Sequence, residues 1–200
     1  MKKQVVFIHG GDAFSSYEKY LEALRSAEYD PVVYGQKRWK HTLAERLGPD
    51  FEVLAPAMPC KDNAKYVEWK IWFEKVLPYI HDGVILIGHS LGGLFLAKYL
   101  SENEFPKEVR ATFLVGAVYD EDSDTHSVGD FELPASLEHF AKHGGDIFLY
   151  HSEDDFVVPV SAIEKYGKAL PDAEEHIFID RGHFLQEEFP ELIEKIKSLS

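Results

Sequence analysis

The sequence has few cysteines, few basic residues and no long apolar run. Cys60 is the single cysteine among 200 residues, so no disulfide can form within the chain, which is consistent with a reducing compartment. No apolar stretch approaches the roughly 20 residues that span a bilayer. Lys and Arg number 21 against 35 Asp and Glu, and this balance argues against a nucleic-acid partner, which requires clustered positive charge. We therefore expect a cytoplasmic protein with no nucleic-acid or membrane partner; its oligomeric state stays open.

Short apolar runs alternate with longer amphipathic stretches. Several of the runs are apolar at every position, as in parallel strands covered on both faces. The first run stops after four residues at His9-Gly10-Gly11, so it indicates a strand and not a signal peptide. The runs span residues 5–8, 51–54, 84–87, 112–115, 147–150 and 177–179. The helix-like stretches span residues 17–27, 39–47, 64–79, 91–101, 136–143, 160–169 and 184–199.

This alternation predicts one α/β domain over residues 1–200, with a mostly parallel central sheet of about six strands and helices on both faces. In such a sheet, ligands bind beyond the carboxyl ends of the strands. Two long connections, from Ser15 to Gly48 and from Tyr119 to Gly145, should stand over that edge. The second is too short for a large cap domain, so we expect an open site. The role of the first at the pocket entrance is left open.

Gly88-His89-Ser90-Leu91-Gly92 is the strongest local motif. It directly follows the apolar run 84–87 and precedes a helix-like stretch, which is the strand–turn–helix setting of a nucleophile elbow. The motif predicts Ser90 as a nucleophile at a helix N-terminus. The alternative is a glycine-rich turn in which Ser90 is an ordinary helix cap.

A serine hydroxyl needs a base and a group that orients the base. In this setting the order along the chain is Ser, Asp, His, and the sequence supplies Asp154-Asp155 after the run 147–150 and His183 after the run 177–179. We favour Asp155, although Asp154 stays open, and either carboxylate could be an exposed turn residue. His183 must be neutral to act as general base, so activity should rise through about pH 6–7.

The first predicted strand ends in His9-Gly10-Gly11-Asp12. Glycines there let the backbone turn beneath the elbow, so that the N–H of Gly11 can point toward Ser90. With the N–H of Leu91, it would form an oxyanion hole. The alternative is a glycine turn with no catalytic part.

In this order, the motifs resemble those of the α/β-hydrolase superfamily, and within it the compact single-domain serine hydrolases of the YdeN-like and retinoblastoma-binding serine hydrolase-like groups. The resemblance implies a cofactor-independent hydrolase, most often of carboxylic esters, with Ser90, Asp155 and His183 as catalytic residues. The Leu-x-Cys-x-Glu motif associated with retinoblastoma binding is absent around Cys60, so that partner is not carried over.

Together these features predict a carboxylesterase for small to medium esters that needs no metal and no cofactor. Residues just beyond the strand ends or beside the motifs are expected to form the pocket walls: Phe14, Met58, Tyr119, Phe156 and Phe184. An acidic run, Asp120-Glu121-Asp122 with Asp124, leaves open an aminoacyl-amide or peptide hydrolase with the same machinery. A third possibility is a non-catalytic binding protein on a hydrolase scaffold. The physiological substrate and its chain length stay open.

Overall fold

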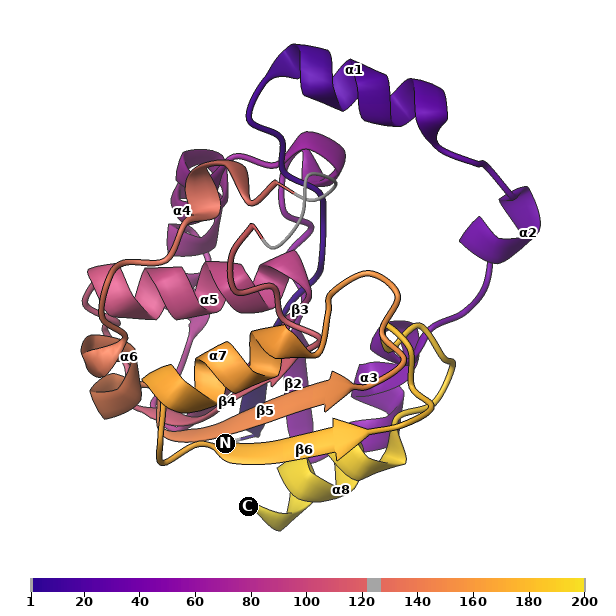
Figure 1. The fold of residues 1–200 in the computed structure, drawn as a ribbon. Coiled ribbons are helices and arrows are strands. Elements are labelled where there is room, and N and C mark those ends of the chain that lie inside the picture. Colours follow the sequence, from indigo (N-terminus) through magenta and orange to yellow (C-terminus); the bar gives the residue numbers. More distant parts are fainter. Residues whose placement is uncertain (1, 122–126, 200) are drawn as a thin grey trace.

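A computed structural model describes residues 2–121 and 127–199 of the chain (Figure 1). Six strands form one sheet in the order β2-β1-β3-β4-β5-β6, and every neighbouring pair is parallel. The predicted parallel six-stranded sheet is confirmed. The strands are β1 (Lys3–Ile8), β2 (Phe51–Leu54), β3 (Val84–His89), β4 (Val109–Val115), β5 (Asp146–Ser152) and β6 (Glu174–Phe178).

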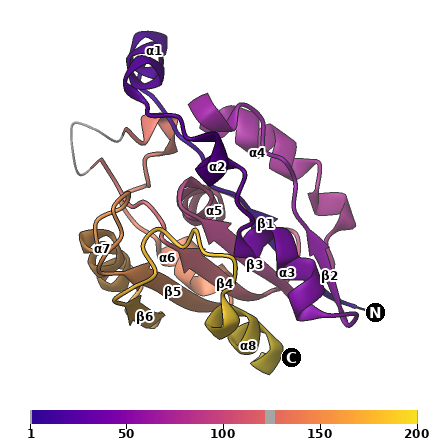
Figure 2. The same cartoon turned by 90° about the vertical axis from the view of Figure 1, so that its right-hand side faces the viewer.

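Helices cover both faces of the sheet (Figures 1 and 2). One face carries α4 (Tyr66–Glu74), α5 (Leu91–Glu102), α6 (Glu138–His143) and α7 (Ser161–Ala169), and the other carries α3 (Trp39–Leu47) and α8 (Pro190–Ser198). Two more helices, α1 (Tyr17–Ser26) and α2 (Pro31–Tyr34), lie between β1 and α3, and short 3₁₀ turns span Lys61–Asn63, Leu77–Tyr79 and Gly129–Phe131. In the described ranges, no helix is both long and apolar enough to cross a membrane.

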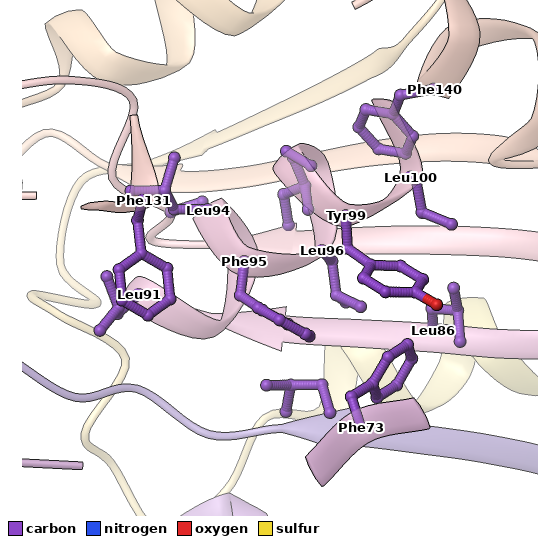
Figure 3. Close-up of a cluster of buried hydrophobic side chains, with 14 of the residues drawn as sticks. Phe73, Leu86, Leu91, Leu94, Phe95, Leu96, Tyr99, Leu100, Phe131 and Phe140 are labelled. Carbon is purple, nitrogen blue, oxygen red and sulfur yellow. The ribbon is translucent and has the colours of Figure 1, made fainter. Parts of the chain in front are cut away.

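The largest apolar cluster surrounds α5. This helix has apolar residues on nearly all sides, as is typical of a helix buried within a protein. Figure 3 shows Phe95 and Tyr99 of α5 lying beside Phe73 of α4, and the ring centroids of Phe73 and Tyr99 are 4.9 Å apart. A Cβ built on Gly92 would lie 2.3 Å from the carbonyl oxygen of Ile8. Glycine at this position therefore lets the first turn of α5 pack directly against the end of β1.

Two predicted helices differ from the structure by five or more residues at one end. The helix expected over residues 64–79 stops at Glu74 and is followed by a separate 3₁₀ turn containing Pro78, whose ring nitrogen cannot continue a helix. The helix expected over 184–199 begins at Pro190, a favoured residue for the first helical position. Residues before it form a loop, in which Phe184 has a positive φ of 52°.

Helix α1 stands away from the two helical layers (Figures 1 and 2). The structure describes every residue of α1, and none of them is buried. Together with α2, α1 forms the middle of the long connection between β1 and β2 that the sequence left without a role.

Candidate functional site

Ser90 sits in a strained turn between β3 and α5. Its backbone has φ 55° and ψ −123°, a region that L-residues rarely occupy and that must be held by the surrounding structure. The N–H of Ser90 donates to the carbonyl of Val115 at 2.9 Å, which ties the turn to the end of β4. A Cβ on Gly88 would lie 2.5 Å from the carbonyl oxygen of Gly92, so the motif glycines are needed for this tight approach. The turn therefore has the backbone of a nucleophile elbow.

His183 and Asp155 form a buried hydrogen-bonded pair. Nδ1 of His183 lies 2.8 and 3.1 Å from the two carboxylate oxygens of Asp155, and the side chains are 7% and 0% exposed. A carboxylate accepts, so Nδ1 carries the proton and Nε2 is left as an acceptor. The Asp155 carboxylate also accepts from the N–H groups of Val157 and Val158 at 2.8 and 2.9 Å. His183 thus has the tautomer that a general base requires.

Asp154 has a different role in the same loop. Its carboxylate accepts from the hydroxyl of Ser152 and, at 2.8 Å, from the N–H of Gly182. These two hydrogen bonds lower the pKa of the Asp154 carboxyl. Asp154 therefore fastens the loop before His183, whereas Asp155 contacts the imidazole itself.

Two ring N–H groups hold the loop that carries His183 by hydrogen bonds to its backbone carbonyls. Nε2 of His89 donates to the carbonyl of His183 at 2.9 Å, and Nε1 of Trp39 donates to the next carbonyl, that of Phe184, at 2.9 Å. The rings of His89 and His183 lie 4.9 Å apart, which places the His183 imidazole beside the elbow. Burial, and then the nearby His183, hold the pKa of His89 well below its usual value, so His89 is neutral. Motif reasoning did not identify Trp39, whose partner lies 145 residues away.

Two other histidines fix the surrounding loops. Nε2 of His151 donates to the carbonyl of Val158 at 3.0 Å and so closes the loop that contains Asp155. Nδ1 of His9 lies 2.7 Å from the carbonyl of Gly10, and its Nε2 accepts from the N–H of Met58 at 2.8 Å. Burial lowers the pKa of both His9 and His151, which favours the neutral rings that these contacts use.

The loop after β1 is paired with the loop after β2. The N–H of Asp12 donates to the carbonyl of Lys61 at 2.8 Å, and the N–H of Ala64 donates to the carbonyl of Asp12 at 2.8 Å. A Cβ on Gly11 would lie 2.4 Å from the same Lys61 oxygen, so this position requires glycine. Leu91 is the first residue of α5, where an N–H has no partner within the helix. Gly11 and Leu91 line one cavity together with Ser90.

That cavity has a volume of about 720 Å³. Of the five predicted walls, Phe14 and Tyr119 line it. The other three do not, and their assignment as walls is corrected. Met58 is buried in the apolar cluster that includes the residues of α5. Phe184, whose positive φ turns it away, is buried on the opposite face of the sheet. Phe156 is 74% exposed at the surface. In the predicted acidic run, Asp120 lines the cavity, whereas Asp122 and Asp124 lie outside the described residues.

Comparisons of the sequence and of the structure with known proteins agree on one family. Residues 34–197 match the family model described as serine hydrolase. The chain is 30% identical to the serine hydrolase RBBP9 of Rattus norvegicus over 172 residues, which is 85% of this chain and 89% of that protein. The structure is similar to that of the ydeN gene product of B. subtilis, with a TM-score of 0.75 and 19% identity over 99% of this chain and 98% of the other. It is also similar to the esterase RhEst1 of Rhodococcus sp. ECU1013, with a TM-score of 0.61 and 16% identity over 98% and 90% of the two chains.

Proposed function

Because the chain belongs to the serine hydrolase family and has the α/β-hydrolase fold, we propose that it is a carboxylesterase acting through an acyl-enzyme on Ser90. One observation supports this most strongly. The buried Asp155 carboxylate holds Nδ1 of His183, which leaves Nε2 free to accept a proton beside the strained Ser90 turn.

The reaction would proceed in two halves. Nε2 of His183 takes the hydroxyl proton of Ser90 as Oγ attacks the ester carbonyl, and Asp155 stabilises the imidazolium. The N–H groups of Gly11 and Leu91 stabilise the oxyanion, each contributing about 3 kcal/mol to the transition state. The imidazolium then returns its proton to the leaving alcohol. In the second half, His183 activates water, which hydrolyses the acyl-enzyme and releases the acid and free Ser90.

Small to medium esters suit the cavity best. Its volume of about 720 Å³ lies within the range of pockets that enclose small organic ligands. Apolar side chains form much of its lining, including Phe14, Val118 and Val128. A neutral acyl group can therefore be desolvated there at low cost.

Aminoacyl amides or esters are a second candidate substrate class, favoured by the charge of the same cavity. Among the described lining residues, four are carboxylates and one is a lysine: Asp12, Glu28, Asp62, Asp120 and Lys61. Asp62 pairs with Lys61 and Asp120 pairs with Lys165, and the excess of carboxylates that remains in the lining would attract a substrate with a free ammonium group. Comparing p-nitrophenyl acetate with aminoacyl p-nitroanilides separates the two classes, and the absence of anilide turnover would eliminate amide hydrolysis.

A fluorophosphonate probe and p-nitrophenyl acetate test the proposed nucleophile. The wild-type protein should be labelled and should turn over the ester, and Ser90→Ala should lose labelling and at least about 10³-fold in rate. Ser101→Ala, at the far end of the same helix, is the matched control and should behave as the wild type. A folded wild-type protein that neither labels nor turns over esters would instead support a binding role on a hydrolase scaffold.

A further inference from the structure

Helix α1 presents an apolar stripe to the cavity of Ser90. Tyr20, Ala23 and Leu24 follow the spacing i, i+3, i+4, which places them on one side of α1, and all three line the cavity together with Ala27, the residue that caps the C-terminus of the helix. A stripe of this kind normally packs against the body of a protein. Here it does not, since no residue of α1 is buried and Leu24 is 52% exposed.

The opposite wall of the cavity combines aliphatic and polar side chains, the polar ones including Asp120 and Ser127. Its aliphatic part comes from the segments after β4 and β5 and from α7, and includes Val118, Val128, Val157 and Ala162. Ser90 and Leu91 line the same space. The uncovered stripe of α1 therefore faces further aliphatic side chains, and the space between them is continuous with the proposed nucleophile.

The position of α1 over this space is fixed at its first turn. The hydroxyl of Ser16 caps the helix by accepting from the N–H of Lys19 at 3.2 Å. The rings of Phe14 and Tyr20 lie 5.5 Å apart, and Nζ of Lys65 donates to the carbonyl of Phe14 at 2.8 Å. A helix of 10 residues is marginal in water without tertiary packing, so material that fills the cavity would stabilise α1.

We propose that the hydrocarbon chain of the substrate acyl group packs between the α1 stripe and the opposite aliphatic wall, so that α1 determines acyl-chain specificity. This inference rests on the proposed esterase function. The stripe lines a cavity that Ser90, Gly11 and Leu91 also line, and an acyl chain attached to the carbonyl that Ser90 attacks would extend into this space. Unbranched medium-length acyl chains are then the preferred class.

Chain-length dependence of kcat/KM is the first test, with p-nitrophenyl acetate, butyrate and octanoate below their micellar concentrations. In the wild-type protein, kcat/KM should rise about 3- to 4-fold for each added methylene that becomes buried. Leu24→Glu should lower kcat/KM for octanoate by at least about 10-fold and leave acetate within about 2-fold. Leu24→Met should retain the octanoate rate.

Arg25→Gln is the matched control, because it makes the same change in net charge at the neighbouring position of α1, outside the cavity lining. It should leave the rates on acetate and octanoate unchanged. Two outcomes would overturn the acyl-chain site while the esterase proposal stands. One is an equal loss of kcat/KM on both esters in Leu24→Glu. The other is a wild-type protein that hydrolyses acetate but shows no rise in kcat/KM with chain length.

Measuring binding in a variant that cannot react tests the acyl-chain site independently of the proposed esterase reaction. Titration calorimetry of Ser90→Ala with the neutral ketones 2-octanone and acetone should show binding of 2-octanone alone, and Leu24→Glu in that background should abolish it. Such binding in a protein whose wild type hydrolyses no ester would support the apolar-chain site and overturn the proposed reaction. Absence of 2-octanone binding to folded Ser90→Ala would overturn the site.

Discussion

The Nε2–H of His89 donates a 2.9 Å hydrogen bond to the backbone carbonyl of His183, so the residue before the proposed nucleophile holds the proposed base. The next carbonyl, that of Phe184, accepts from the indole of Trp39. Phe184 itself has a positive φ, a conformation that costs energy and persists where neighbouring contacts enforce it. The position of the His183 imidazole therefore depends on two rings from other parts of the chain as well as on Asp155.

Replacing the indole tests this dependence. Trp39→Phe keeps an aromatic ring against Phe7 and Phe189 but leaves the buried Phe184 carbonyl without its donor, at a cost of about 1–3 kcal/mol. We expect kcat on a short ester to fall about 10-fold with KM nearly unchanged, because the base is displaced and the cavity is not. Steady-state kinetics measure both constants. Trp72→Phe, an exposed indole on α4, is the control, and an unchanged kcat in Trp39→Phe would remove the positioning role.

The two neighbouring aspartates should give separable phenotypes. Asp155→Asn presents an amide to Nδ1 of His183 and allows the wrong tautomer, so kcat should fall by about 10³- to 10⁴-fold with little loss of stability. Asp154→Asn weakens the contacts to Ser152 and Gly182, so it should lower the melting temperature and leave kcat within about 10-fold. Thermal melting and ester kinetics on both variants measure these effects. A greater loss of kcat in Asp154→Asn than in Asp155→Asn would reverse the assignment.

Features encoded within short stretches could be predicted from the sequence, and contacts between distant stretches could not. The strand, glycine turn and helix around Ser90 are contiguous, and the predicted site residues Asp155 and His183 follow strands that end at one edge of a parallel sheet. Trp39 gave no such signal, because its indole reaches a carbonyl 145 residues away. Phe156 and Phe184 lie next to predicted site residues as well, but the backbone direction decides their positions. Phe184 turns into the core at a positive φ, and Phe156 turns into solvent.

Two buried histidines, His89 and His151, and the partly buried His9 make the stability of the fold depend on pH. Burial lowers the pKa of His9, His89 and His151 in the folded protein, whereas in the unfolded chain each titrates near pH 6.5. Below that pH the unfolded state binds more protons, so the free energy of unfolding should decrease as the pH falls from about 7 to 5. The slope can reach about 1.4 kcal/mol per pH unit for each histidine.

Urea unfolding at pH 7.5, 6.5 and 5.5 measures this slope. His151→Gln should reduce it, because one of the buried rings is removed. His81→Gln, at an exposed loop position, should leave the slope unchanged. Equal stability at pH 7.5 and 5.5 in the wild-type protein would contradict the role assigned to the neutral rings.

The strained backbone of Ser90 should lower the free energy of unfolding, and this cost can be measured. Glycine occupies positive φ readily and alanine does not, so Ser90→Gly should be more stable than Ser90→Ala by about 1 kcal/mol, although glycine is usually the less stabilising residue. Urea unfolding of the two inactive variants measures the difference. Ser101, within α5, should give the opposite order, since alanine favours a helix and glycine does not. Ser101→Ala should be more stable than Ser101→Gly by up to about 1 kcal/mol. If the alanine variant were the more stable at both positions, the Ser90 turn would store no strain. The tight elbow would then not lower the free energy of unfolding.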